Sequence, residues 1–420
     1  MGAALSLIAA FIPRAFARPA SPAYDPAARE LTYTTADGER VLAEDSIVVI
    51  VPAKDGNGYT ILAIEEPVPK PDAEAPAELP TLTSVPATEL PDTLLKSYAA
   101  RPPPVTPTEL HVVISVLSGA GQAHTFHTSL LAPLLSHLPL PTAVVHSTTS
   151  PHTITELTTT RFLPAANAGK AQHIVILSGD GGPVDLINGL MASPHGPAYV
   201  PPTISVLPLG TANALAHSAG VTRDGTHGLS VLARGTGKRV PLFKATFSAG
   251  ARALSHEGRQ ADALPETEGE HALWGAVVAS WGLHAGLVAD SDTAEYRKYG
   301  VERFGMAARE AVFPSDGGGP HVYRGKVRVR TGGKWREVGG GEHAYVLVTL
   351  VSHLEKGFCI SPASGPLGGG LRLVYFGPRG GEDVMRIMGL AYQGGKHVDD
   401  SAVTYEEVEE RDIVRLTVLE

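Results

Sequence analysis

The chain has 420 residues, of which 43% are hydrophobic and 18% charged, so it is long enough for two domains with their own cores and for further segments. Its formal net charge is −9, and it contains neither a long basic run nor a nucleic-acid-binding motif, so we expect no nucleic-acid partner. The single cysteine, Cys359, excludes an intrachain disulfide and a zinc site built from cysteines, and it fits a reducing compartment.

The chain starts with a short apolar segment. Residues 1–12 lack a basic start, which makes them a poor signal peptide, and no run in the chain reaches the roughly 18 apolar residues of a membrane-spanning helix. The first six residues, Met-Gly-Ala-Ala-Leu-Ser, fit the N-myristoylation pattern, with a frayed or wrongly assigned start as the alternative. We therefore expect a cytoplasmic protein that associates peripherally with a membrane surface.

Residues 1–64 are expected to hold a flexible start, up to about residue 25, and a small β unit. Strand patterns over 31–35 and 40–42 flank Asp37-Gly38, and those over 47–51 and 59–64 flank residues 55–58, which read Asp-Gly-Asn-Gly. Both gaps are hairpin signals. Residues 65–107 hold roughly a third of the chain's 34 prolines, a composition that favours an extended, solvated linker.

Strands and helices alternate from residue 108 to 237. Apolar strands are predicted over 111–117, 142–146, 174–177 and 203–207, and helices over 124–138, over 153–161 and from Pro183 onward. This alternation predicts an α/β domain with a parallel sheet and helices on both faces.

Three turns of small residues follow three of these strands, at 118–122, 178–182 and 208–216. Because the carboxyl ends of parallel strands lie along one edge of the sheet, we expect the turns to converge there. The second turn, Ser-Gly-Asp-Gly-Gly, leads into a helix N-terminus, and such an end binds anions through free N–H groups; an ordinary strand-to-helix loop is the alternative. Asp180 lies within this turn and needs a metal, a proton or a hydroxyl group as its partner.

The character of the chain changes after residue 237. Strands are predicted over 239–247, 273–281, 321–330, 344–350 and 371–376, with glycine-rich joints between them. A helical insert is predicted over 292–312 and a short helix over 383–390. Residues 238–420 therefore form a second, β-rich domain.

Four segments in fixed order resemble the diacylglycerol-kinase-type catalytic superfamily, and within it the sphingosine kinases most. These are S-G-D-G-x-x-x-[DE]-x-x-N-G-L at 178–190, G-[ST]-x-N-A-L-A at 210–216, the segment from Ser280 through Arg303, and residues 362–397. The resemblance implies an ATP-binding domain related to phosphofructokinase and NAD kinase, followed by a β-sandwich domain that binds lipid, with Mg²⁺ as a further cofactor. It implies transfer of a phosphoryl group to the primary hydroxyl of a sphingoid base or related lipid.

The resemblance also implies roles for individual residues. Asp180 would accept the proton of the attacking hydroxyl, and Asp185 would support the loop or a metal-bound water. Asp292, with Asp290 and Ser280, would bind the amino and hydroxyl groups of the long-chain base; a helix cap is the alternative for the acidic pair. The residues that would hold the nucleotide are Ser118, Gly119, Gly121, Thr148, Ser178, Gly179, Gly181, Asp185, Gly210, Thr211, Asn213, Arg297 and Arg303. A solvated helix face is the alternative for the two arginines.

The sequence departs from the family pattern at several positions. Ser115 stands where the family has Asn, Gln122 where it has a basic residue, and Gly182 where diacylglycerol kinases have Thr. A final acidic D-G-E segment would follow a strand over 413–419, and the sequence ends at Glu420 without it. Three functions therefore stay open: a sphingosine kinase, a diacylglycerol or ceramide kinase, and a weak or non-catalytic relative that binds lipid or nucleotide, with a truncated gene model as the other explanation of the missing segment.

Overall fold

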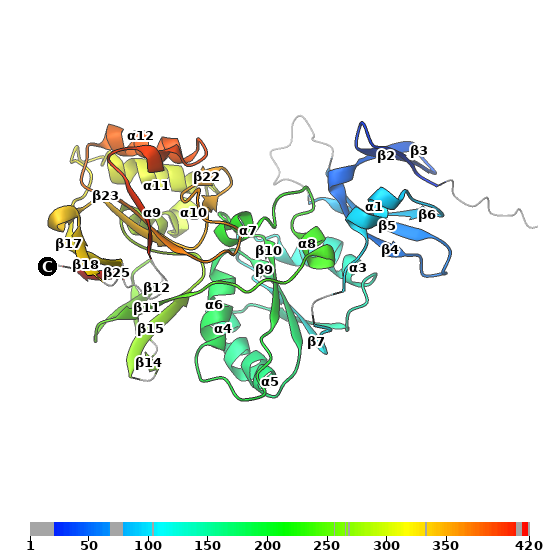
Figure 1. Ribbon diagram of the computed structural model, residues 1–420, viewed down its shortest axis with the longest axis horizontal. Helices are drawn as coiled ribbons and strands as arrows, with labels where there is room; N and C mark the ends of the chain where they lie inside the picture. The colour runs from blue at the N-terminus through cyan, green and yellow to red at the C-terminus, as the bar shows by residue number, and fades with distance from the viewer. Residues whose placement is uncertain are drawn as a thin grey trace, which may run out of the picture.

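The computed structural model describes residues 21–67, 79–102, 105–255, 257–264, 266–267, 269–331, 334–408 and 414–418. Three units follow one another along the long axis of the molecule, with the N-terminal unit at one end, the α/β domain in the middle and the β-rich domain at the other end (Figure 1). The predicted myristoylation site and most of the predicted flexible start lie outside the described residues.

The N-terminal unit consists of two antiparallel three-stranded sheets. The first contains β1 (Ala23–Asp25), β2 (Glu30–Thr35) and β3 (Gly38–Ala43), and the second β4 (Ile47–Pro52), β5 (Tyr59–Glu65) and β6 (Thr81–Ala87). Both predicted hairpins are confirmed, since β2 pairs with β3 and β4 with β5.

The prediction of an extended linker over 65–107 is wrong for residues 79–102. These residues form β6, which pairs along the whole of β5, and the helix α1 (Asp92–Tyr98), which buries Leu94 and Tyr98. Pro86 is accommodated because β6 is an edge strand and the residue is exposed. Two prolines in this stretch lie in an edge strand, at Pro86, and at the start of a helix, at Pro91, and not in a solvated linker.

The middle domain has a four-stranded parallel sheet with the order β10-β9-β7-β8, which confirms the predicted α/β class. The strands are β7 (Glu109–Ile114), β8 (Ala143–Ser147), β9 (Gln172–Ser178) and β10 (Thr203–Pro208). β9 is buried along its whole length, as its run of β-branched residues predicts.

Helices cover both faces of this sheet. One face packs against α2 (Ala123–Phe126), a π-helical segment at His127–Leu131, α3 (Ala132–Leu135) and α8 (Leu229–Arg234). The other packs against α4 (Thr153–Leu157), a π-helical segment at Thr158–Phe162, α5 (Leu163–Asn167) and α6 (Gly181–Leu190). α7 (Ala214–Ala219) follows β10.

The third unit is largely antiparallel β, as predicted. Its central sheet has the order β16-β20-β23-β24, formed by Val278–Gly282, Tyr345–Thr349, Leu371–Phe376 and Thr404–Val408. One face packs against β17 (Tyr323–Thr331) and β18 (Lys334–Val338), and β17 also pairs with β19 (Glu342–His343) and β25 (Val414–Val418). This arrangement of two sheets face to face is a sandwich. The other face carries α9 (Leu283–Ser291), α11 (Glu302–Val312) and α12 (Gly381–Ala391), and α10 (Ala294–Arg297) precedes α11.

Smaller strands complete this unit. β11 (Phe243–Phe247), β15 (Glu270–Gly275) and β14 (Glu266–Thr267) form one sheet, while β12 (Arg252–Ser255) pairs with β13 (Gln260–Ala263) and β21 (His353–Glu355) with β22 (Phe358–Cys359).

The single strand predicted over 273–281 is two strands in different sheets. The chain leaves β15 at Gly275, passes through the buried residues Ala276 and Val277, and enters β16. The helical insert also begins earlier than predicted, at Leu283, because Gly282 has φ 90° and ψ −145°, a conformation that favours glycine and turns the strand directly into α9.

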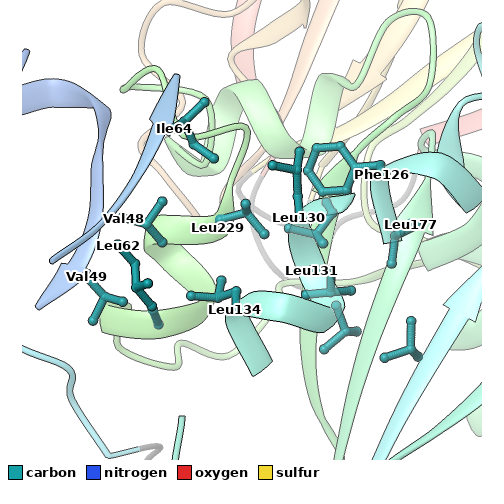
Figure 2. Packing of buried hydrophobic residues seen from close by; sticks show 14 of the residues in the cluster. Val48, Val49, Leu62, Ile64, Phe126, Leu130, Leu131, Leu134, Leu177 and Leu229 are labelled. Carbon is teal, nitrogen blue, oxygen red and sulfur yellow. The ribbon is translucent and has the colours of Figure 1, made fainter. Parts of the chain in front are cut away.

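The N-terminal unit shares one hydrophobic core with the middle domain. Side chains from β4 and β5 pack against the helical layer of the sheet, as Figure 2 shows for Val48, Val49, Leu62 and Ile64 beside Leu130, Leu131 and Leu134. The same cluster continues into β7 and β9. The hydrophobic packing is therefore continuous across the boundary between the two units.

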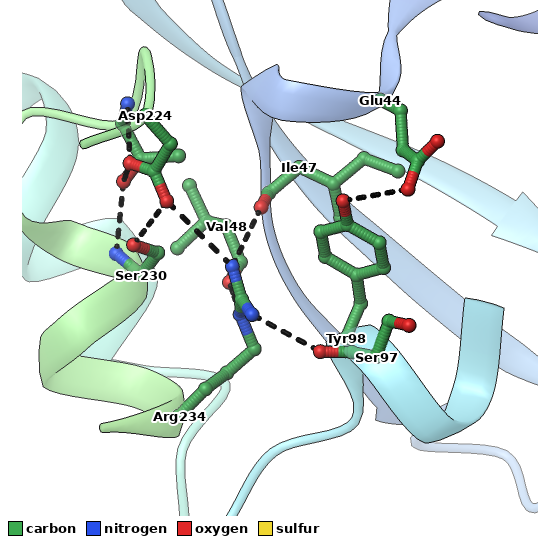
Figure 3. A network of polar contacts seen from close by, with 9 residues as sticks. Glu44, Ile47, Val48, Ser97, Tyr98, Asp224, Ser230 and Arg234 are labelled. Atoms are coloured by element: carbon green, nitrogen blue, oxygen red, sulfur yellow. Dashed lines mark hydrogen bonds and ion pairs between the residues drawn. The ribbon is translucent and has the colours of Figure 1, made fainter. Parts of the chain in front are cut away.

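Arg234, at the end of α8, adds polar contacts to this boundary (Figure 3). Its Nε donates to the carbonyl of Val48 at 2.7 Å and its Nη1 to that of Ser97 at 3.0 Å, and the guanidinium lies 4.7 Å from the centre of the Tyr98 ring. Asp224, 3.9 Å from Nη2, faces it from the middle domain.

Candidate active site

The three predicted turns meet at the carboxyl end of the parallel sheet. A Cβ atom placed on Gly210 would lie 2.2 Å from the Cα atom of Gly179, and one placed on Gly119 would lie 2.4 Å from the carbonyl oxygen of Leu209. Glycine is therefore required at these positions so that main chain can touch main chain. The predicted convergence of the turns is a feature of the fold.

The turn after β10 is closed by its own asparagine. Asn213 has φ 56° and precedes α7, its Oδ1 accepts from the amide of Gly210 at 2.9 Å, and its Nδ2 donates to the carbonyl of Gly210 at 2.8 Å. Asparagine is one of the few residues that adopt this conformation readily. Thr211, between them, is half-buried.

The turn after β7 is tied to the end of β8. The Thr148 hydroxyl accepts from the amide of Val116 at 3.1 Å, and the Ser118 hydroxyl donates to Oγ of Ser115 at 2.7 Å. Gly121 has φ 72°, and its amide donates to the Ser118 carbonyl. Ser118 and Thr148 thus stabilise the turn in this structure.

Asp180 joins two of the turns. Its Oδ2 accepts from the amide of Ala214 and its Oδ1 from that of Leu215, both at 2.8 Å, so the carboxylate caps the N-terminus of α7. Burial raises the pKa of Asp180, and the amides of Leu215 and Ala214 act in the opposite direction. Each oxygen retains a lone pair that can accept a further hydrogen bond.

The N-terminus of α6 lies directly after the second turn. The helix has ten residues and begins at Gly181, which is exposed and would have open space around an added Cβ atom. Ser178 is buried, and its hydroxyl donates to the Gly179 carbonyl at 2.8 Å. Gly182 is required because a Cβ there would lie 2.2 Å from Oγ of Ser178. The helix start therefore presents amide groups at an open position beside Asp180.

Asp185 lies in the same helix and is half-buried. Burial raises its pKa to about 6, and the charge of His152 acts in the opposite direction. A carboxylate in such surroundings gains from a nearby cation. Within the described residues no group of three or more His, Cys, Asp or Glu side chains is placed to hold a metal.

A second group of predicted residues lies together in the β-rich domain. Arg297 donates from Nε to Oδ1 of Asp292 at 3.1 Å and from Nη2 to Oδ2 at 2.7 Å, and Nη1 of Arg303 lies 3.6 Å from Oδ1. Asp292 thus occupies both arginines, and it follows α9 directly as its C-cap residue. In this structure Arg297 is exposed, as the alternative of a solvated helix face expects, whereas the side chain of Arg303 is only 14% exposed.

The remaining predicted residues flank this group. Ser280, on β16, has its Oγ 2.8 Å from Nδ1 of His284, whose pKa burial lowers to about 4. Burial raises the pKa of Tyr323, and the charge of Asp290, in the last turn of α9, raises it further. The site residues therefore form two groups, one on each domain.

A large cleft lies away from both groups of residues. It has a volume of about 1450 Å³ and runs along β10, with Pro183, Ile187 and Leu215 in its mainly apolar lining. None of the predicted site residues lines it, although all of them belong to the described part of the chain. Residues of α6 and α7 line it, but the turns at 178–182 and 209–213 that precede these helices do not.

Three residues at the boundary of the two domains received no role from the sequence: Asn188, Ser218 and Trp274. Asn188 stands in the N-G-L end of the first motif, which was the one available signal. Its partner Trp274 lies 86 residues away in sequence. Gly189, which follows, is required because a Cβ there would lie 2.6 Å from Cβ of Thr158.

The middle domain is similar to a known protein family. Residues 109–245 match the family "Diacylglycerol kinase catalytic domain", whereas no curated protein sequence matches the chain. None of the helices in the described residues has the length and apolarity needed to cross a membrane.

Solved structures from Bacillus anthracis str. Sterne are also similar. One, named as a candidate diacylglycerol kinase, has 16% identity and a TM-score of 0.49, and the match covers 72% of this chain and 84% of that chain. A second candidate diacylglycerol kinase has 13% identity and a TM-score of 0.47, with 74% and 94% covered. Residues 109–245 of this chain are thus similar to the diacylglycerol kinase catalytic domain by the family match.

Proposed function

We propose that this protein transfers the terminal phosphoryl group of ATP to a primary hydroxyl group of a lipid. The observation that carries the proposal is the position of Asp180, a half-buried carboxylate at the meeting point of three glycine turns and beside the start of α6. Phosphoryl transfer needs positioned charge and little covalent chemistry, and this arrangement offers both an anion site and a base.

The turns would bind the phosphates through main-chain amides. Gly119, Gly179 and Gly210 bring main chain against main chain, so the turns would offer peptide N–H groups to a ligand. The amide of Gly210 is not among them, because it donates to Oδ1 of Asn213. The open start of α6 at Gly181 supports an oxygen of the phosphate chain through the helix dipole. Ser118, Thr148, Thr211 and Asn213 would fix the shape of the turns around the nucleotide.

Asp180 would accept the proton of the lipid hydroxyl. The two amides that cap it orient its carboxylate, while burial raises its pKa toward the range in which a carboxylate takes up a proton effectively. Asp185 would support the turn or a water bound to Mg²⁺, because Mg²⁺ usually keeps several of its waters in kinase sites. When bound, the ion neutralises phosphate charge.

The second group of residues would bind the outer phosphates of ATP and the lipid. Arg297 and Arg303 would bind the β- and γ-phosphates, and to do so they must leave Asp292. The side chains of Arg297 and Asp292 are each 52% exposed, so water weakens the ion pair between them. Once free, Asp292 would bind the amino group of a sphingoid base, with Asp290 and Ser280 near its hydroxyl groups. A sphingoid base is the substrate we propose, with diacylglycerol and ceramide as the alternatives; attachment to a membrane surface would bring the enzyme to any of them.

Asp180→Asn tests the function directly. The amide keeps the shape but cannot take up a proton, so turnover should fall at least about 100-fold while the protein stays folded. Asp224→Asn is the matched control, because Asp224 also accepts from a main-chain amide, that of Thr226, and from the Thr226 hydroxyl, but lies outside the site. If Asp180→Asn keeps more than about a tenth of the wild-type turnover number, the assignment of the base is wrong.

The lipid is identified by the same assay with labelled ATP and a panel of sphingosine, diacylglycerol and ceramide. We expect sphingosine to be phosphorylated fastest, and Asp292→Asn to reduce its phosphorylation by roughly 10- to 150-fold, the contribution of one charge-assisted hydrogen bond. Activity toward the neutral lipids should fall less. An equal loss for all three lipids would make Asp292 a structural partner of Arg297, and no transfer to any lipid by the wild-type protein would refute the proposed function.

A further inference from the structure

The β-rich domain is attached to the two helices that begin in the proposed active site. α6 starts at the Gly179–Gly182 turn, and α7 starts at the two amides bound by Asp180. α6 contacts β15, and α7 contacts β21. The part of the molecule that would present the lipid is therefore fixed to the elements that would hold the phosphates.

Asn188 makes the first attachment. Its Nδ2 donates to the main-chain carbonyl of Trp274 at 2.9 Å, and its Oδ1 accepts from the main-chain amide of Trp274 at 2.9 Å. The same Nδ2 donates to the carbonyl of Val184, one turn earlier in α6, which fixes the rotamer of the side chain. A carboxamide that pairs with both polar groups of one peptide residue sets both distance and orientation, because either bond alone would leave a free rotation.

Ser218 makes the second attachment in the same way. Its hydroxyl donates to the main-chain carbonyl of His353 at 3.2 Å and accepts from the main-chain amide of His353 at 3.0 Å. Ser218 is buried, whereas Asn188 is half-buried. Each attachment joins a side chain of the kinase domain to a strand of the other domain through paired hydrogen bonds.

A small apolar contact lies at the same boundary. Ala214, Leu215, Val277 and Val351 are buried together, and further side chains from both domains pack against them: Val184, Val206, Val278, Leu354 and Leu367. This cluster excludes water from the boundary. The two polar pairs add direction to it, because hydrogen bonds depend on orientation and hydrophobic contacts do not.

We infer that Asn188 and Ser218 are positioning residues that align the lipid-binding domain with Asp180. The inference rests on the proposed function, because it assigns the two substrates to different domains. Neither side chain touches a substrate. Their loss should leave each substrate able to bind but should spoil the alignment of the hydroxyl with the phosphate, and a misplacement of about 1 Å is enough to cost about 100-fold in rate.

The test is the double variant Asn188→Ala/Ser218→Ala in the full chain. We expect its turnover number to fall by roughly 10- to 100-fold, while its ATP dissociation constant, measured by calorimetry, changes less than twofold because the turns lie within one domain. Ser218→Thr, which keeps the hydroxyl, should restore most of the loss caused by Ser218→Ala. Equal losses in ATP affinity and in turnover would show a general structural defect and overturn the inference.

Matched controls are available within the kinase domain. Asn167 accepts from the amide of Gly196 at 2.9 Å, and Ser230 donates to Asp224 at 2.7 Å, both without reaching the second domain. Asn167→Ala and Ser230→Ala should leave the turnover number within about threefold of the wild type. If these controls lose as much turnover as the double variant, the boundary has no special role.

A distance measurement keeps the inference separate from the proposed function. Spin labels on the exposed residues Thr160 and Glu382 report the separation of the two domains, with the buried Cys359 replaced by alanine. The wild type should give one narrow distance distribution, and the double variant a broader one. An unchanged distance distribution in the double variant overturns the inference even if the wild type is active. A broadened distribution supports the role of Asn188 and Ser218 in aligning the domains even if no lipid is phosphorylated.

Discussion

The middle domain is joined to its two neighbours in different ways. Toward the N-terminal unit it buries large aliphatic side chains in a core that continues into its own sheet, and Arg234 donates to carbonyls on the far side (Figures 2 and 3). Toward the β-rich domain it shares a smaller cluster of alanine, valine and leucine side chains and makes two paired hydrogen-bond contacts.

The contrast separates a permanent attachment from an adjustable one. Opening the first boundary would expose leucine, valine and phenylalanine side chains, each worth about 1.5–3 kcal/mol when buried. Opening the second exposes less apolar surface and exchanges four hydrogen bonds for bonds to water, each with a net value of about 1 kcal/mol. We expect the N-terminal unit to fold as one body with the kinase domain, and the β-rich domain to change its orientation more readily.

Truncation of one side chain at each boundary should show the largest difference. Leu131→Ala, in the core shared with the N-terminal unit, should lower the free energy of unfolding by about 2–5 kcal/mol, because it leaves a cavity in a fully buried cluster. Val351→Ala, at the other boundary, removes less side chain and should cost about 1 kcal/mol. Urea unfolding followed by fluorescence measures both, and a cost for Val351→Ala that equals that of Leu131→Ala would remove the contrast.

Removal of the Arg234 guanidinium should have the next largest effect. Arg234→Met keeps the aliphatic stem but leaves the carbonyls of Val48 and Ser97 without their donor, so we expect a loss of about 2–3 kcal/mol in the free energy of unfolding. Arg324→Met is the control: Arg324 pairs with Glu342 at 3.3 Å but is 69% exposed, and such a pair contributes less than about 1 kcal/mol. Equal losses in the two variants would show that the boundary does not depend on Arg234.

The smallest expected effect is a pH response of the second boundary. Burial lowers the pKa of His217 and of His353, and the charges of His353 and Lys356 lower that of His217 further. A histidine whose folded-state pKa lies below its unfolded value stabilises the protein above about pH 6.5, and that stability is lost as the pH falls through the folded-state value. Between pH 7.5 and 5.5 the distance distribution between Thr160 and Glu382 should therefore broaden.

His217→Gln/His353→Gln provides the check on this response. With both imidazoles absent, the distance distribution should no longer depend on pH in this range. If the double variant broadens as much as the wild type does, the response arises from other histidines.

Local signals accounted for most of what could be predicted. The run from Ile174 to Leu177, the glycines that follow it and the apolar spacing after Pro183 specified a buried strand, a turn and a helix without help from distant residues, and the structure contains each. The meeting of the turns followed from the rule for parallel sheets, and the contact of Gly179 with Gly210 confirms it.

The features that were missed depend on distant partners. β6 contains Pro86 and lacks a clear strand pattern, and it forms because β5 offers a free edge. The role of Asn188 requires Trp274, and that of Asp292 requires two arginines that the sequence pattern assigned to phosphate. The residues next to Asn188 or Asp292 in sequence do not indicate which residue each one contacts. The sequence motifs could therefore identify candidate residues but not their contacts.

The main-chain construction of the turns has a consequence for how this protein responds to mutation. At Gly119, Gly179 and Gly210 there is no side chain to remove, so every substitution there adds atoms. Even alanine would act by crowding the turns, and not by deleting a group that contacts a ligand. The informative library at these positions adds atoms: even one methyl group at Gly210 would meet the opposing main chain, so tolerance should fall to zero at the first carbon.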